Sequence, residues 1–473
     1  MSYKTIVGLE IHVELSTKTK AFCSCENIYG AEANTKVCPV CLGLPGAIPV
    51  LNEEAVKYAI MSGIALNCEI NKKSKFDRKN YFYPDLTKGY QITQDDMPIC
   101  KEGYIEIELE NCKKKIGIQK IQLEEDTGKS LHTENDETLI DYNRCGVPLI
   151  EIVSKPDMNS GVEAKLFLEK LKNNLIYIGV SDCKMEEGSL RCDVNVNVKD
   201  EETGRKSAIA EIKNLNSFRA VEKAIEYEVN RQIELLENGE EEIKTTRRWD
   251  DVENKTVLMR VKYTAQDYRF VPDGDLAPIV LNDEYIEEIK NNLPELPEFK
   301  KERFIKEFGL SEYDADVLTS SKEISKYYEE VVSEFDDYNL VSNWIMTEIL
   351  RRIDNKDDFT LPFTSEDFRN LLIAIKEGKI NNNAGKKVLR EMFETGKKPL
   401  DIIKEKGLEQ TSDSSEIEKI VEEVLQSNAQ SIEDYKAGKD RAFGFLVGQV
   451  MKASKGKANP QIVNQLLMEK LNK

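Results

Sequence analysis

The sequence lacks the segments that carry a protein into or across a membrane. Of its 473 residues 40% are hydrophobic, yet no run approaches the length of about 18 apolar residues that a membrane-spanning helix needs. The opening stretch MSYKTIVGLEIHVEL does not have the basic region and apolar region of a secretory signal. We therefore expect a soluble cytoplasmic protein with no membrane partner.

The chain also has little positive charge and no cysteine framework of the secreted type. Its net charge is −19, which excludes a global positive field for collecting nucleic acid, so any such contact must be local. Ten cysteines in 473 residues, four of them bunched between Cys23 and Cys41, are unlike the disulfide pattern of a small secreted domain. This usage favours the reducing cytosol.

Familiar nucleotide-binding loops are missing. Gly128, Lys129 and Ser130 resemble the end of a phosphate loop, but Leu123 stands where that motif needs its first glycine. No G-x-G-x-x-G follows a predicted strand. A bound nucleotide would therefore have to be held by metal and basic side chains.

Two textures divide the chain. Up to about residue 285, short alternating runs predict strands, interrupted by helices predicted at 53–66, 161–178 and 218–237. This pattern, without βαβ alternation, favours an α+β fold with antiparallel sheets. Beyond Pro294 and Pro297 the pattern is almost purely helical, and a polar stretch interrupts it near 409–415. We predict three domains: 1–293 (sheet-rich), 294–408 (helical) and 409–473 (a small helical tail).

Acidic side chains recur on strand faces. In the first strand Glu10, His12 and Glu14 share one face and apolar residues the other. Glu151 lies in a run that is apolar on both sides, and Glu125 continues the apolar face of its own strand. A buried carboxylate is costly without a cation beside it. Further acidic, amide or basic groups recur in the later strands at Arg191, Asp193, Asn195, Asn197, Glu211 and Lys213.

Oxygen ligands with one imidazole suit Mg²⁺ or Mn²⁺ better than a soft metal. The alternative is a set of unrelated solvated strand faces, which the buried positions of Glu125 and Glu151 fit badly.

Four cysteines form a second pattern. Cys23 and Cys25 are followed after twelve residues by Cys38 and Cys41, a spacing that predicts a closed Cys₄ zinc site. The alternative is four free cysteines in a buried loop. A redox role for Cys38 and Cys41 alone lacks the surrounding βαβ pattern.

Cations and aromatics are mixed in the segment SKFDRKNYFYPD, a composition suited to phosphate and stacking contacts. A plain surface loop is the alternative. With Arg191 and Lys213 of later strands, the predicted ATP- or substrate-binding residues are Lys75, Arg78, Lys79, Tyr81 and Tyr83.

The tail differs in charge from the rest of the chain. Residues 436–473 hold eight basic and two acidic residues, a net charge of +6. Lys452, Lys455 and Lys457 are closely spaced around a glycine, which predicts a phosphate-binding loop for tRNA. Lysines that merely keep a helix soluble are the competing interpretation.

Several long motifs together resemble one family. GLEIHVEL, SKFDRKNYFYPD, EEDTGKSLH, GVPLIEIVS, KMEEGSLRCDVNVN, EIKNLNSF and FLVGQVMKASKGKANP are similar to the GatB family, which supplies the tRNA-dependent kinase component of aspartyl/glutamyl-tRNA(Asn/Gln) amidotransferases. The resemblance implies a cradle-shaped kinase domain, a helical domain and a tail that contacts tRNA. It also implies a ligase reaction, in which ATP phosphorylates the side-chain carboxylate of Glu-tRNA(Gln) or Asp-tRNA(Asn) and ammonia then forms the amide.

Carried onto this sequence, the resemblance implies that His12, Glu125 and Glu151 hold one Mg²⁺. Glu10, Asp193 and Glu211 would line a second cation position, and Glu10, His12, Glu125 and Glu151 would be catalytic. The chain has no amidase signature, so ammonia must come from a partner, which in the family is the amidase (A) subunit beside a small C subunit. Some family members lack the cysteines, so zinc rests on their spacing.

Two other functions remain open at this point. A metal-dependent phosphohydrolase would use the same carboxylates to activate water. A non-catalytic tRNA-binding scaffold would explain the basic tail but leave Glu125 and Glu151 without a purpose.

Overall fold

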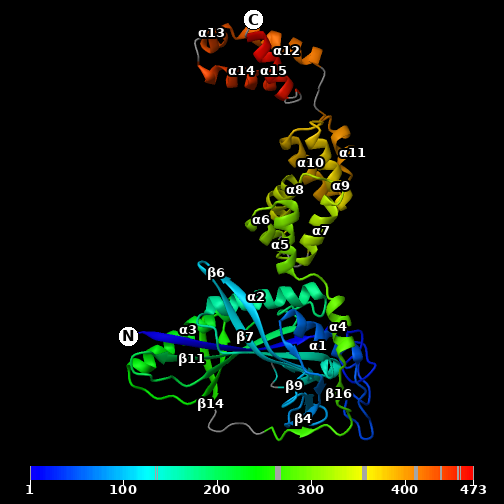
Figure 1. Ribbon diagram of the computed structural model, residues 1–473, viewed down its shortest axis with the longest axis vertical. Helices are drawn as coiled ribbons and strands as arrows, with labels where there is room; N and C mark the ends of the chain where they lie inside the picture. The colour runs from blue at the N-terminus through cyan, green and yellow to red at the C-terminus, as the bar shows by residue number, and fades with distance from the viewer. Residues whose placement is uncertain are drawn as a thin grey trace. The chain divides into compact units, whose positions relative to one another are not determined.

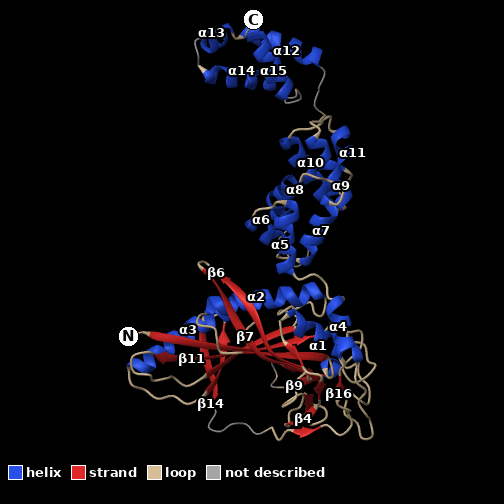
Figure 2. Ribbon diagram, in the orientation of Figure 1, coloured by secondary structure: helices blue, strands red, loops and turns tan. Residues whose placement is uncertain are grey.

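The computed structural model describes residues 2–133, 135, 137–261, 268–353, 359–409, 414–436, 439–454, 458 and 460–471. The chain forms two compact units, Met1–Pro297 and Glu298–Lys473. The first is rich in strands, and the second is helical throughout its described part (Figures 1 and 2). The predicted α+β class is confirmed.

A large sheet organises the first unit. In the described part of this unit it has nine strands, with the first strand of the chain at its centre. In sheet order these are β14 (Lys255–Val261), β13 (Thr245–Asp250), β12 (Ala210–Lys213), β11 (Leu190–Asp200), β1 (Tyr3–Glu14), β10 (Pro148–Ser154), β7 (Cys112–Glu125), β6 (Cys100–Leu109) and β2 (Glu69–Ile70).

One pair in this sheet is parallel. β12 and β13 run in the same direction, whereas their neighbours pair antiparallel. Parallel strands need a crossover of about a dozen residues or more, and α3 (Phe218–Glu237) supplies it. The prediction of purely antiparallel sheets without a βαβ unit is wrong at this point.

Helices cover the apolar face of the large sheet. α1 (Glu53–Ala65), α2 (Gly161–Ile178) and α3 pack there, and α4 (Asp283–Asn291) lies against α1 (Figure 2). The side chains of Val7, Leu9, Ile11 and Val13 on β1 are fully buried beneath them. Their burial fixes the register of β1, because a slip of one residue would exchange its two faces.

The three helices of this unit begin or end where the sequence predicts. Ser217 caps α3 by accepting a hydrogen bond from the Ala220 amide, and Ser160 caps α2 in the same way from Glu163. Gly179 ends α2 with a left-handed φ of 75°, which glycine adopts without strain.

Short strands lie on the other side of the large sheet from α2, as β4 and β9 show in Figure 1. They form three small sheets in the described residues: β15 (Val271–Pro272), β4 (Asp77–Asn80) and β5 (Tyr90–Thr93); β16 (Ile279–Val280) and β3 (Lys73–Ser74); and β8 (Lys129–His132) with β9 (Thr138–Asp141). A 3₁₀ turn, η1 (Tyr142–Arg144), follows β9.

The second unit has two hydrophobic cores that share no residue. One is built by α5 (Pro297–Phe308), α6 (Glu312–Thr319), α7 (Lys322–Val332), α8 (Tyr338–Trp344), η2 (Ile345–Ile349), η3 (Leu350–Arg352), α9 (Ser365–Lys376), α10 (Asn382–Thr395) and α11 (Pro399–Glu405). The other is built by α12 (Ser414–Ser427), α13 (Ala429–Lys436), α14 (Asp440–Ala453) and α15 (Pro460–Leu471). The division into domains 1–293, 294–408 and 409–473 stays a prediction.

A close approach of α2 to α3 gives a test of the packing. A Cβ atom added at Gly161 would lie 2.5 Å from the backbone oxygen of Glu222, which cannot swing aside as a flexible side chain would. We expect Gly161→Ala to lower the free energy of unfolding by about 1–3 kcal/mol, the usual cost of overpacking. Urea unfolding measures the change.

Gly444→Ala is the matched control, because a Cβ atom at Gly444 in α14 meets open space. That substitution should leave stability unchanged or raise it by up to about 1 kcal/mol. Equal effects of the two substitutions, each on its own unfolding transition, would contradict the close approach.

Candidate functional site on the polar face of the sheet

The polar face of the large sheet collects its side chains from five neighbouring strands. On β1 it carries Glu10, His12 and Glu14, which alternate with the buried apolar residues. The register places His12 opposite Glu151 of β10 and Arg191 of β11, and Glu10 opposite Asp193. Residues opposite each other in antiparallel strands project from the same face, so these groups meet there.

His12, Glu124 and Glu151 form the first group. One ligand atom from each lies within 4.8 Å of the others, and His12 Nε2 is 3.8 Å from Glu124 Oε1. The Glu124 side chain is 1% exposed, and its Oε2 has no hydrogen-bond partner. A buried carboxylate oxygen without a partner is unfavourable unless a cation binds it.

Electrostatics in this group fit a cation. Burial, helped by Arg191, lowers the pKa of His12 to about 3, so the imidazole is neutral at pH 7 and can offer a lone pair. Burial and then the charge of Glu151 raise the pKa of Glu124 to about 8. Burial also raises the pKa of Glu151. Two carboxylates and one neutral imidazole are ligands that Mg²⁺ or Mn²⁺ accepts.

Glu125 does not belong to this group, which corrects the predicted ligand set. Its side chain continues the apolar face of β7, where it accepts hydrogen bonds from Lys88 Nζ and from the Ile92 amide at 3.0 Å. Glu124 takes its place, because Glu124 is in phase with Gln122, the residue opposite Glu151. That phase was readable in the sequence.

Glu10, Asp193 and Glu211 form a second group, as predicted, with ligand atoms within 4.8 Å of one another. The ammonium of Lys213 lies among them, bonded to Asp193 and 3.3 Å from Glu211 Oε1. Asn195 donates a hydrogen bond of 2.8 Å to Glu10. A metal ion at this position would have to displace the Lys213 ammonium.

Glu14 and Asp126 form a third group, which the sequence did not single out. Arg191 Nη2 donates to Asp126 Oδ2 at 2.5 Å, and Arg144 Nε lies 3.7 Å from the same oxygen. Burial and the charge of Asp126 raise the pKa of Glu14 to about 8, while Arg191 and Arg144 hold the pKa of Asp126 below its usual range. A cavity of about 490 Å³ adjoins this group.

The predicted phosphate-binding segment is split between two environments. The charge of Lys79 acts on Glu124 and Glu151, and its Nζ lies 4.9 Å from the Tyr268 ring centre. Burial and then the charges of Asp85 and Glu124 raise the pKa of Tyr81. Lys79 and Tyr81 therefore lie at the first group, as predicted.

Lys75 and Arg78 lie elsewhere. Lys75 Nζ pairs with Asp77 at 2.6 Å and Asp96 at 2.7 Å. Arg78 pairs with Asp273 at 2.7 Å and Asp275 at 2.8 Å. Alternation along β4 turns Arg78 away from the face that Lys79 occupies. The structure does not bring these two to the polar face, and Tyr83 is 63% exposed.

The four cysteines of the predicted metal site converge. The Sγ atoms of Cys23, Cys25, Cys38 and Cys41 lie within 4.8 Å of one another, and the Cys38 amide donates to Cys41 Sγ at 3.1 Å. A hydrogen bond from Cys23, then the Cys38 amide and Lys20, lower the pKa of Cys41 to about 4. This Cys₄ cluster is compatible with zinc, which binds thiolates tetrahedrally.

Lys20 completes the cysteine cluster from inside. The residue is 0% exposed, and its Nζ donates to the Lys36 carbonyl at 2.8 Å and to Cys41 Sγ at 3.7 Å. Thr87, the neighbour of Lys88, donates to the Cys41 carbonyl at 2.8 Å. The cysteine loop is thereby fastened to the segment that carries Lys88.

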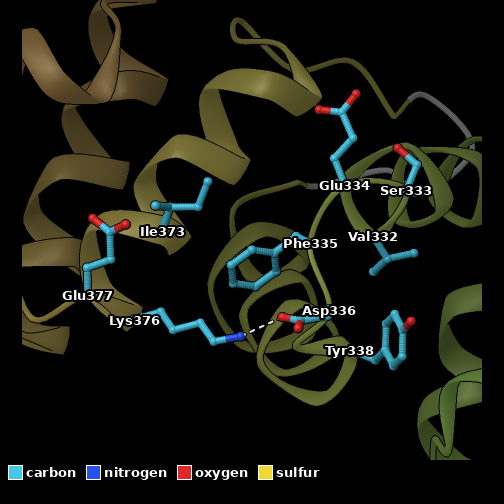
Figure 3. Close-up of a pocket in the computed structure, with 9 residues that line it drawn as sticks. All are labelled: Val332, Ser333, Glu334, Phe335, Asp336, Tyr338, Ile373, Lys376 and Glu377. Carbon is cyan, nitrogen blue, oxygen red and sulfur yellow. Dashed lines mark hydrogen bonds and ion pairs between the residues drawn. The ribbon is translucent and has the colours of Figure 1, made fainter.

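The second unit offers a cavity of about 680 Å³ but no group of metal-ligand side chains in its described part. Figure 3 shows its acidic side chains beside Phe335, with Lys376 Nζ paired to Asp336 at 2.6 Å. Of the predicted tRNA-binding lysines, Lys452 is exposed in the last turn of α14, whereas Lys455 and Lys457 lie outside the described residues.

Among the described helices, none is both long enough and apolar enough to cross a bilayer.

Comparison with known proteins places the chain in a class and then in a family. The model of the GatB/GatE catalytic domain matches residues 5–287, the unit that holds the polar face, and the model described as GatB domain matches 326–471. The chain belongs to the GatB family of amidotransferase subunits.

Full-length relatives are named as the GatB-type component of aspartyl/glutamyl-tRNA(Asn/Gln) amidotransferase. Those of Clostridium tetani, Caldicellulosiruptor saccharolyticus and Thermoanaerobacter pseudethanolicus are 54%, 53% and 53% identical, each match covering 100% of both chains.

Proposed function

We propose that this chain is the ATP- and Mg²⁺-dependent subunit of a ligase that converts Glu-tRNA(Gln) or Asp-tRNA(Asn) to the amide. The observation that carries the proposal is the group of His12, Glu124 and Glu151, with the unpartnered Glu124 oxygen, in a full-length member of this family. The reaction brings a carboxylate to the γ-phosphate of ATP, so positioning and neutralisation of negative charge carry most of the catalysis.

In this proposal His12, Glu124 and Glu151 hold the Mg²⁺, which when bound neutralises charge on the phosphate and the carboxylate. Lys79 and Arg191, which act electrostatically on these residues, hold and orient the anionic substrates. Glu10, Asp193 and Glu211 form the second cation position, with Lys213 as its resident charge.

The ammonia comes from a partner. The relatives are named as subunits, and we propose that an amidase (A) subunit releases ammonia from glutamine and that a small C subunit completes the complex in the cytoplasm.

The decisive experiment is a turnover assay on the assembled complex with glutamine, ATP and charged tRNA. We expect His12→Ala or Glu124→Gln to lower amide formation by about 100-fold or more, the scale of losing an electrostatic stabiliser. Glutamine hydrolysis by the partner should survive at least in part. Normal amide formation by either variant would sink the assignment. ATP turnover that needs no charged tRNA would point to a phosphohydrolase instead.

Glu125→Gln is the matched control, because Glu125 neighbours Glu124 in the chain but bonds to Lys88 on the other face. It should keep Mn²⁺ binding, measured by electron paramagnetic resonance, while Glu124→Gln loses it. Leaving Lys88 without its carboxylate should cost about 3–5 kcal/mol of stability.

We also propose that the Cys₄ cluster holds a structural zinc ion, supported by the convergence of its four sulfurs. Protein purified without chelator should contain about one zinc per chain. Cys38→Ser with Cys41→Ser should release the metal and lower the melting temperature, with no specific loss of ATP binding. Metal analysis that finds no zinc would leave the loop as ordinary packing.

The tail is proposed as the local tRNA-binding element, on the strength of its net charge of +6. Removing residues 431–473 should weaken tRNA binding and raise the KM for charged tRNA. Because phosphate contacts release counterions, affinity should fall more steeply with salt for the full chain than for the truncated one. Equal salt slopes and affinities would show that the tail does not bind tRNA.

A further inference from the structure

The cavity beside Glu14 has no part in the function as described so far. It encloses about 490 Å³, enough for a nucleoside, and its wall includes Glu14, Tyr29, Lys129 and Arg144. It adjoins the third group of the polar face, where Glu14 contacts Asp126 and Arg191. A ligand seated there would therefore extend toward the proposed phosphorylation site.

Strand geometry fixes how far this cavity lies from the first group. β1 and β7 each pair antiparallel with β10, so they run in the same direction. Glu14 follows His12 by two residues, and Asp126 follows Glu124 by two. Two residues of a strand span about 7 Å, so the third group lies one side chain's length from the first.

An aminoacyl ester of the substrate has dimensions that match this step. In a glutamyl residue the side-chain carboxyl carbon and the α-nitrogen are separated by about 5 Å when extended, from bonds near 1.5 Å. With the side-chain carboxylate at the first group, the α-ammonium falls beside Glu14 and Asp126. Carboxylates bind an ammonium through charge-assisted hydrogen bonds.

The charges of the wall favour such a ligand over a triphosphate. Carboxylates outnumber cations there, since Glu14, Asp141, Asp182 and Glu187 face only Lys129 and Arg144 among the described lining residues. Arg144 already donates to the carbonyls of Thr127 and Gly128, at 3.0 and 2.9 Å. The phosphates of ATP would be repelled by this wall.

An exposed aromatic supplies a platform for a base. Tyr29 is 67% exposed although it lines the cavity, and the neighbouring Ile28 is 52% exposed. Aromatic side chains at such positions stack on nucleobases, with a gain of about 1–3 kcal/mol per base.

We propose that this cavity binds the aminoacylated terminal adenosine of the charged tRNA, with the α-ammonium at Glu14 and Asp126 and the adenine on Tyr29. The inference rests on the proposed function, whose substrate it places. Glu14 and Tyr29 are accordingly binding residues for the tRNA terminus and set the position of the side-chain carboxylate at His12, Glu124 and Glu151.

Calorimetric titration of the full chain in Mg²⁺ buffer tests the proposal without turnover. The probe is 3′-(L-glutamylamino)-3′-deoxyadenosine, and its matched control is the 3′-glutarylamino analogue, which lacks only the α-amino group. We expect the glutamyl probe to bind about tenfold more tightly, as one charge-assisted contact allows. Glu14→Gln should abolish that preference, and Tyr29→Ala should weaken both probes alike.

Tyr313→Ala, which removes an exposed aromatic in the second unit, should change neither affinity. Equal binding of the two probes by the unaltered chain overturns the proposal. ATP that competes with the probes and is weakened by Tyr29→Ala also overturns it, because the cavity would then be the nucleotide site. The turnover assay separates the two claims: amide formation without probe preference contradicts this inference alone, and probe preference without amide formation contradicts the proposed function alone.

Discussion

Repulsion among carboxylates that share one face of a sheet is the constraint on which the first unit depends. Glu10, Glu14, Glu124, Glu151 and Asp193 project from neighbouring strands into a partly dry space, where like charges interact more strongly than in water. Arginine and lysine side chains offset this repulsion at both ends of the face. Between them, at Glu124, the charge is left for a cation from solution, and the substrate is negatively charged as well.

The apolar face of the same sheet makes this arrangement affordable. Val7, Leu9, Ile11 and Val13 are buried under helices, and their contribution is roughly 1.5–3 kcal/mol for each fully buried side chain. That burial holds the strands in register, and the register holds the carboxylates together. A site that is unfavourable by itself is stabilised by the hydrophobic face behind it.

Much of this was predictable from the sequence, because strand alternation and helix caps act locally. Ser217, Gly179 and the two faces of β1 are examples, and the cysteine spacing foretold the convergence of the four sulfurs. The choice between Glu124 and Glu125 went wrong because both lie at the end of β7, where burial suggested one residue and strand phase the other. Arg144 and Asp126 come together through strand pairing between distant segments, which no local pattern reports.

The central position of β1 has a consequence for how the protein is made. This strand leaves the ribosome first, but its partners β10 and β11 end at Ser154 and Asp200. At synthesis rates of about 5–20 residues per second, β1 waits for roughly ten to forty seconds with both edges open. Exposed apolar strands of that length invite aggregation, and charged residues along them oppose it. The same glutamates that bring charge to the polar face thus guard the nascent chain before that face exists.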